Sequence, residues 1–178
     1  MKKYPITIAG LRRELTLCPV NDHLDIGAFI MFSDVELTIA CAKALLQIAP
    51  EFDALITAES KGIPLAYEMA RQSGKQYLLA RKSIKLYMVN PVEVKVKSIT
   101  TAREQKLYLD ETDMQYIAGK KILLVDDVIS TGESIAALEQ LVERARGVVA
   151  GKMAVLAEGD AQERTDIQYL EKLPLFTK

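Results

Sequence analysis

The sequence of 178 residues has little of what marks several large classes of protein. It contains one histidine, His23, without a partner motif, and two cysteines, Cys18 and Cys41, that are not spaced as metal ligands. No apolar stretch approaches the length of a membrane span, and the first residues lack the apolar core of a signal peptide. We therefore expect a reduced protein of the cytoplasm that has no membrane partner.

An excess of charge of one sign is also absent. The chain has 23 lysines and arginines against 24 aspartates and glutamates, which gives a formal net charge of −1. Proteins that bind nucleic acid usually carry a basic excess, so we expect no nucleic-acid partner. Hydrophobic residues make up 49% and charged residues 26% of the chain, as in ordinary globular proteins. The length then predicts a single domain over residues 1–178 with a hydrophobic core of its own.

Helices and strands are predicted to alternate along the chain. Apolar residues at helical spacing predict helices over 34–48, 62–73 and 134–146. Short aliphatic or alternating runs predict strands over 54–58, 76–80, 92–99, 106–109, 122–125 and 148–157, with one or two more within 4–20. This order predicts an α/β fold with a doubly wound, mainly parallel sheet flanked by helices. In such sheets ligands bind beyond the carboxyl ends of the strands.

The segment from Ile122 to Ser134 is the most informative part of the sequence. An aliphatic run predicts a strand buried on both faces, and two adjacent carboxylates, Asp126 and Asp127, follow it. A small polar loop then opens a helix, where backbone N–H groups and hydroxyls favour a phosphate. The loop consists of Ser130, Thr131, Gly132, Glu133 and Ser134. Carboxylates beside a phosphate cradle suit a sugar phosphate, whereas the structural alternative is an acidic turn with an ordinary helix cap.

A second loop, from Thr57 to Gly62, also follows a predicted strand and opens a predicted helix. Its backbone N–H groups, Lys61 and Gly62 make another candidate anion site. The next predicted strand is followed directly by Arg81 and Lys82, with Lys85 three residues on. Two anion sites in one domain suit a ligand with phosphates at both ends. A solvated basic turn remains the alternative for these cations.

These two loops resemble those of the type I phosphoribosyltransferases, whose phosphoribosyl diphosphate (PRPP) motif is a hydrophobic strand that ends in Asp-Asp and continues as a small-residue loop with Thr-Gly. The resemblance covers about residues 20–160 and is closest to the adenine phosphoribosyltransferases. It implies a small N-terminal hood over about residues 1–35 and a flexible lid hairpin over about 95–112. It also implies transfer of the 5-phosphoribosyl group from PRPP to a purine base, adenine or xanthine, with release of diphosphate. Because members are usually dimers, we expect a homodimer.

The resemblance also implies roles for single residues. Asp126 and Asp127 would hold the ribose hydroxyls, stabilise positive charge at the anomeric carbon and hold Mg²⁺, directly or through water. The residues from Ser130 to Ser134 would bind the 5′-phosphate. Glu133 stands where the adenine branch usually has glycine, so its carboxylate must point away from that phosphate. The diphosphate is assigned to Glu59, Ser60, Lys61, Gly62, Arg81, Lys82 and Lys85, and Lys106 in the lid is also assigned to PRPP binding.

Some of these assignments depart from the family pattern or have a structural alternative. Lys61 stands where the adenine branch has arginine, and it would contact phosphate as a point charge. A non-proline cis peptide is expected near Ser60–Lys61. Glu104 is assigned a proton-handling role in the lid, where a charged exposed hairpin explains the composition equally well. The base is assigned to Phe29, Ile30, Val128 and Ile129, which are also ordinary core residues.

A regulatory protein that senses PRPP or a nucleotide and retains this fold is the alternative function. Such proteins usually carry a DNA-binding domain or a basic face, and this sequence predicts neither. The retained pair of aspartates favours the enzyme, although a sensor can keep it. An intact sugar site beside an open, unlined base pocket would favour the sensor.

Overall fold

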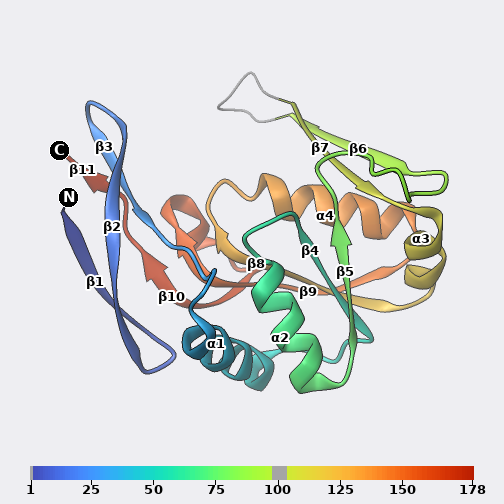
Figure 1. Ribbon diagram of the computed structural model, residues 1–178, viewed down its shortest axis with the longest axis horizontal. Helices are drawn as coiled ribbons and strands as arrows, with labels where there is room; N and C mark the ends of the chain where they lie inside the picture. The colour runs from blue at the N-terminus through green and yellow to red at the C-terminus, as the bar shows by residue number, and fades with distance from the viewer. Residues whose placement is uncertain (1, 98–103) are drawn as a thin grey trace.

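The aliphatic run before Asp126 lies in the central strand of a five-stranded parallel sheet, whose strand order is β10-β9-β8-β4-β5 (Figure 1). The computed structural model describes residues 2–97 and 104–178, with the side chains of residues 96, 97, 104 and 105 outside the described set. The strands of this sheet are β4 (Ala54–Ala58), β5 (Gln76–Ala80), β8 (Lys121–Ile129), β9 (Val148–Glu158) and β10 (Gln168–Leu173).

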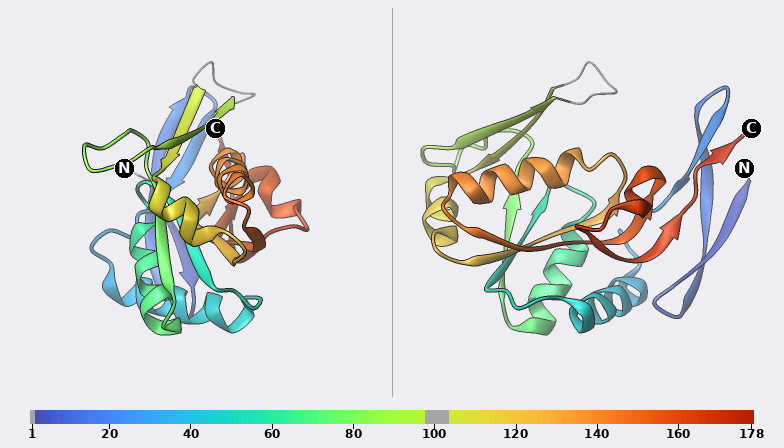
Figure 2. Two further views of the ribbon diagram at one scale, coloured as in Figure 1. Left: turned by 90° about the vertical axis from the view of Figure 1, so that its right-hand side faces the viewer. Right: turned by 180° about the vertical axis from the view of Figure 1, so that it is seen from behind.

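Helices cover both faces of this sheet, as Figure 2 shows from two further sides. They are α1 (Val35–Ile48), α2 (Ile63–Ser73), α3 (Glu111–Ile117), α4 (Glu133–Arg144) and the short 3₁₀ helix η1 (Gly159–Glu163). Successive side chains of β8 alternate between the faces. Ile122 and Leu124 pack in the core that contains α4, whereas Leu123 and Val125 pack in the core that contains α1 and α2. The predicted doubly wound arrangement is therefore confirmed.

The N-terminal residues form a second sheet at one end of the molecule, close to both chain termini (Figure 1). Its strands are β1 (Lys3–Ile8), β2 (Leu11–Asn21), β3 (Leu24–Ala28) and β11 (Phe176–Thr177), in the order β1-β2-β3-β11. The fourth strand comes from the other end of the chain and pairs with β3. The sequence pattern predicted strands in the N-terminal segment but gave no indication of this partner.

A two-stranded hairpin of β6 (Val92–Lys97) and β7 (Glu104–Leu109) lies over α4. Arg144 Nη1 at the end of α4 donates a hydrogen bond of 2.7 Å to the carbonyl of Glu93. Tyr108 forms a backbone bridge with Arg81, which joins the hairpin to the end of β5. The predicted lid therefore corresponds in part to this hairpin, and residues 98–103 lie outside the described residues.

Three of the differences from the predictions have a physical cause in the structure. β8 continues to Ile129, because Asp126 and Ile129 still pair with Ala154 and Ala157 of β9. The two aspartates thus lie within the strand and not after it. Helix α3 was not predicted, since it has only seven residues and depends on the Asp110 side chain, which accepts the N–H of Asp113 at 2.9 Å. The end of α4 at Arg144 comes before the predicted residue 146, because Arg146 adopts a left-handed φ of 60°.

Among residues 2–97 and 104–178, none of the helices has both the length and the apolar character needed to cross a bilayer.

Candidate functional site

The carboxyl ends of β4, β5 and β8 bring the predicted site residues to one edge of the sheet. The start of the helix after β4 lies close against β8 at Gly62. A Cβ added to Gly62 would lie only 3.5 Å from the Cα of Asp126 and would collide with the Thr57 hydroxyl. Only glycine leaves room for this approach. The parallel sheet therefore places the two candidate anion loops next to the pair of aspartates.

The loop after β8 encloses a cavity of about 120 Å³. The lining residues are Asp126, Val128, Ile129, Ser130, Thr131, Gly132, Glu133, Ser134 and Ile135. Gly132 precedes the first residue of α4 with a left-handed φ of 81°, which glycine adopts without strain. The cavity thus lies at a helix N-terminus, where backbone N–H groups and the helix dipole favour an anion.

The two aspartates differ in their surroundings. Asp127 is 2% exposed, and its Oδ2 lies 2.9 Å from Nζ of Lys61 in an ion pair. Asp126 Oδ1 accepts the N–H of Asp127 at 2.8 Å, and its side chain lines the cavity. Burial and then the negative charge of Asp127 raise the pKa of Asp126 well above its ordinary value. A cation bound at this pair would oppose that shift and favour the ionised carboxylates.

The loop after β4 turns sharply at its acidic residue. The Glu59 N–H still donates to Ala80 of β5 at 2.9 Å, and the next peptide bond, Glu59–Ser60, is cis. The cis bond expected near Ser60–Lys61 therefore lies one bond earlier, because pairing with β5 continues to Glu59 and the chain reverses directly after it.

Glu59 contacts the basic residues that follow β5. Its Oε2 accepts the N–H of Lys82 at 2.9 Å, while its Oε1 lies 3.4 Å from Arg81 Nη2 and 4.0 Å from Lys85 Nζ. The N–H of Lys82, followed by the charge of Arg81, lowers the pKa of Glu59 below its ordinary value. Lys61, Arg81 and Lys85 are thus each engaged with a carboxylate of the same site.

Three polar atoms at this edge are buried without a hydrogen-bond partner in the described part of the chain. They are Thr57 Oγ1, Arg81 Nε and Asp127 Oδ2, of which the last has only its ion pair with Lys61. Buried polar groups are normally hydrogen-bonded, so these atoms indicate that a polar ligand completes the site. Thr57 was not predicted as a site residue, because a threonine inside a strand carries no local signal of such a role.

Two adjacent carboxylates are suitable ligands for Mg²⁺. The described residues contain no group of three or more histidine, cysteine, aspartate or glutamate side chains placed to hold a metal on their own. Mg²⁺ usually binds one or two carboxylates together with substrate phosphates and keeps several waters. The donor set of Asp126 and Asp127 therefore fits a Mg²⁺ ion that arrives with a phosphorylated ligand.

Comparison with known proteins identifies the family. A family model described as the phosphoribosyl transferase domain matches residues 35–173. The chain belongs to this family. The hypoxanthine/guanine phosphoribosyltransferase of Methanothermococcus okinawensis is 31% identical over 86% of this chain and 84% of its own. A probable purine biosynthesis transcriptional regulator, PurR, of Streptococcus pneumoniae is 27% identical over 81% of this chain. The matched segment covers 54% of the length of the regulator.

The fold is that of the adenine phosphoribosyltransferases. The crystal structure of the enzyme from Thermoanaerobacter pseudethanolicus superposes with a TM-score of 0.71 at 19% sequence identity, covering 89% of this chain and 95% of that one. The family model and this superposition confirm the predicted resemblance to type I phosphoribosyltransferases. In sequence and fold the protein is thus a phosphoribosyltransferase of the purine-salvage type.

The four residues predicted to bind the base differ in how far their side chains are buried. The side chains of Phe29 and Ile129 are buried in the two cores, at 3% and 2% exposed. Ile30 is 56% exposed in the segment between β3 and α1, and Val128 lines the cavity, which Ile129 also borders. Side-chain contacts with a base are therefore open to Ile30 and Val128, whereas Phe29 would contact a base through its backbone.

The described lid residues contact one another within the hairpin. Lys106 Nζ lies 3.6 Å from Glu93 Oε2 within the hairpin, and the hydroxyl of Tyr108 donates to the same carboxylate oxygen at 2.5 Å. The backbone of Glu104 begins β7, but its side chain lies outside the described residues. The proton-handling role of Glu104 stays a prediction.

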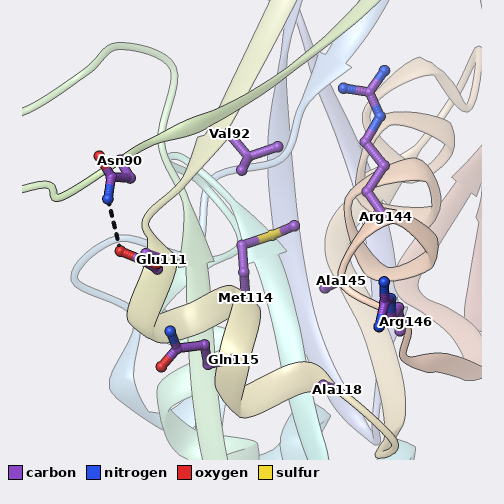
Figure 3. A pocket seen from close by; sticks show the side chains of 9 residues that line it. All are labelled: Asn90, Val92, Glu111, Met114, Gln115, Ala118, Arg144, Ala145 and Arg146. Atoms are coloured by element: carbon purple, nitrogen blue, oxygen red, sulfur yellow. Dashed lines mark hydrogen bonds between the residues drawn. The ribbon is translucent and has the colours of Figure 1, made fainter.

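A larger pocket of about 410 Å³ lies at the C-terminal end of α4 (Figure 3). It is lined by Asn90, Val92, Glu111, Met114, Gln115, Ala118, Arg144, Ala145 and Arg146. None of the predicted site residues is among them. The 12 residues of α4 separate this pocket from the cavity at the start of the helix, so it is not part of the phosphoribosyltransferase site.

Proposed function

We propose that the protein transfers the 5-phosphoribosyl group from PRPP to a purine base, with adenine or xanthine as the favoured acceptor, and releases diphosphate. The arrangement of the two anion loops on either side of Asp126 and Asp127 carries this proposal. The loop after β8 would hold the 5′-phosphate, and the loop after β4 would hold the diphosphate. Mg²⁺ as cofactor, a homodimeric assembly and a cytoplasmic location belong to the same proposal.

The reaction would break the bond between the anomeric carbon and the diphosphate oxygen while a base nitrogen forms a bond to that carbon. The proton on this nitrogen leaves to solvent or to a nearby carboxylate. Asp126 and Asp127 would accept hydrogen bonds from the ribose hydroxyls and place negative charge near the developing cation. Lys61 and Arg81 would neutralise the departing diphosphate. When bound, Mg²⁺ would be held by Asp126 and Asp127 and would supply positive charge that stabilises the departing diphosphate.

The ion pairs within the site would exchange partners when the substrate binds. Lys61 would move from Asp127 to the diphosphate, and Asp127 would then be free to accept a ribose hydroxyl. Arg81 and Lys85 would likewise exchange Glu59 for diphosphate oxygens. Substrate binding would therefore replace existing ion pairs, and Mg²⁺ held at Asp126 and Asp127 would supply the positive charge that Lys61 withdraws from the buried Asp127.

Replacing Lys61 by alanine tests this exchange of partners. We expect Lys61→Ala to raise the KM for PRPP by about tenfold, because it removes one charge-assisted contact with the diphosphate. The KM for the base should change by less than a factor of about two, since Lys61 faces the diphosphate and not the acceptor. Steady-state kinetics with each substrate varied in turn measure both constants. Equal increases in the two constants would refute the diphosphate role.

The similarity to PurR favours a second candidate, a regulatory protein that binds PRPP or a nucleotide without transferring it. Both candidates use the same phosphate loops and aspartates, so substrate binding alone does not separate them. Base-dependent turnover does, because only the transferase needs an acceptor.

The deciding experiment incubates the protein with PRPP, Mg²⁺ and one base at a time and measures diphosphate release. The panel holds adenine, guanine, hypoxanthine, xanthine, uracil and orotate, with a reaction lacking base as the control. Release that depends on a purine supports the transferase and names its acceptor. Absence of release with every base, together with calorimetric binding of PRPP or a nucleotide, would instead support the regulator.

A further inference from the structure

The segment after β9 brings a guanidinium group to the loop that follows β8. η1 lies beside the loop that leads from β8 into α4 (Figure 1), and Arg164 follows it directly. A Cβ added to Gly132 would collide with Nη1 of Arg164, and Cζ of Arg164 would lie 3.6 Å from it. The guanidinium therefore lies against the face of Gly132 where other residues carry a side chain.

A chain of ion pairs fixes this guanidinium. Nε and Nη2 of Arg164 donate to the two carboxylate oxygens of Asp166 at 2.9 and 2.7 Å, in a bidentate fork. Asp166 also lies 3.2 Å from Lys152 Nζ, which in turn lies 2.9 Å from Glu139 of α4. The chain thus ties Arg164 to the helix that begins at the loop. Its remaining nitrogen, Nη1, has no hydrogen-bond partner within the described residues.

The loop itself supplies no positively charged side chain for a phosphate. The sequence from Ser130 to Ser134 contains no lysine or arginine, and it includes the carboxylate of Glu133. A phosphate monoester carries a charge of about −1.5 to −2 at neutral pH. Backbone N–H groups and the helix dipole supply only partial positive charge, so a carboxylate in the loop works against binding.

We infer that Arg164 is a positioning residue for the sugar 5-phosphate. Its contact with Gly132 holds the loop in the conformation that presents the backbone N–H groups, and its Nη1, which Asp166 leaves without a partner, faces the loop. The inference rests on the proposed function in assigning a 5-phosphate to this loop. It adds a residue outside both predicted loops on which the binding of that phosphate depends.

Separate titrations of ribose 5-phosphate and inorganic diphosphate test this role by calorimetry. Arg164→Ala should weaken ribose 5-phosphate binding by about tenfold, because the loop loses the side chain that holds its backbone N–H groups in place. Diphosphate binding should stay within a factor of about two, since that ligand binds at the other loop. Arg164→Lys keeps the charge but not the fork, so it should lie between the wild type and Arg164→Ala. Arg146→Ala, an exposed arginine beyond the other end of α4, should behave as the wild type.

Three outcomes would overturn the inference. The first is unchanged binding of ribose 5-phosphate by Arg164→Ala. The second is an equal loss of affinity for ribose 5-phosphate and diphosphate in this variant, and the third is that the wild type does not bind ribose 5-phosphate. If the wild type binds ribose 5-phosphate but shows no base-dependent turnover, the proposed transferase function fails while the test of Arg164 still holds. If turnover is present, Arg164→Ala should raise the KM for PRPP and leave the KM for the base unchanged.

Discussion

Replacing Asp126 and Asp127 together by asparagine is expected to lower diphosphate release by at least about a thousandfold. The two carboxylates lie in β8 between the two anion loops, and the double variant removes both negative charges that would stabilise the developing cation. It also removes the two carboxylate ligands that would hold Mg²⁺. Single-turnover measurements with saturating PRPP and base report the chemical step directly.

The fold of this double variant should be intact. Burial and the charge of Asp127 raise the pKa of Asp126, so the ionised form of Asp126 is disfavoured in the folded protein. The free-energy cost of ionising Asp126 in the folded protein is absent below the pKa that Asp126 has in the unfolded chain. It grows as the pH rises toward the higher pKa of Asp126 in the folded protein. At neutral pH the thermal midpoint of Asp126→Asn should therefore equal or exceed that of the wild type, with no such gain near pH 4.

The matched control is Asp22→Asn, which changes an exposed aspartate in the turn between β2 and β3. It should leave both turnover and thermal midpoint unchanged. Turnover of the double variant within a factor of about ten of the wild type would exclude the assigned site.

Replacing Gly62 by alanine should lower turnover by about a hundredfold, because small displacements of catalytic groups have effects of this size. Gly62 has an ordinary negative φ of −75°, so the expected effect comes from packing and not from backbone strain. The added Cβ would collide with the Thr57 hydroxyl and would lie 3.2 Å from Asp126 Oδ1. Thr57 is fully buried in β4, where neighbouring atoms restrict its side chain. The start of α2 must therefore shift away from β8, at a cost of about 1–3 kcal/mol in stability.

A double-mutant cycle with Thr57→Ala tests this explanation. Thr57→Ala removes the hydroxyl that the new methyl group would meet, so the double variant Gly62→Ala/Thr57→Ala should recover part of the lost stability and turnover. Chemical denaturation gives the four free energies of unfolding from which the coupling energy is calculated. A coupling energy near zero would show that the two positions do not compete for the same space.

Much of the fold was predictable because its signals are local. The helices predicted over 34–48 and 62–73 begin and end within one residue of α1 and α2, and the strands predicted over 54–58 and 76–80 coincide with β4 and β5. Helical spacing, an aspartate that caps α1 and a glycine that ends α2 are all readable in a short window of sequence. The two loop motifs also lie where a parallel sheet must place them.

Elements that depend on distant partners were not predictable in this way. β8 extends past Asp126 because β9 continues beside it, and the last strand of the N-terminal sheet comes from Phe176–Thr177. Neither segment has a local sequence pattern that indicates which strand it pairs with. Backbone hydrogen bonds between strands join residues far apart in sequence, so the limits of a strand depend on its neighbours.

The sequence by itself determined the family, the α/β order and the residue types of the site. The signals for strand, loop and helix in 57–62 and 122–134 come from residues that are neighbours in the sequence, so they can be recognised without the fold. Only the tertiary structure decided which charges meet. It pairs Lys61 with Asp127, gathers Arg81 and Lys85 on Glu59, and places Arg164 against Gly132. These contacts depend on side-chain directions and on the packing of distant segments, because electrostatic interactions follow distance in space and not separation along the chain.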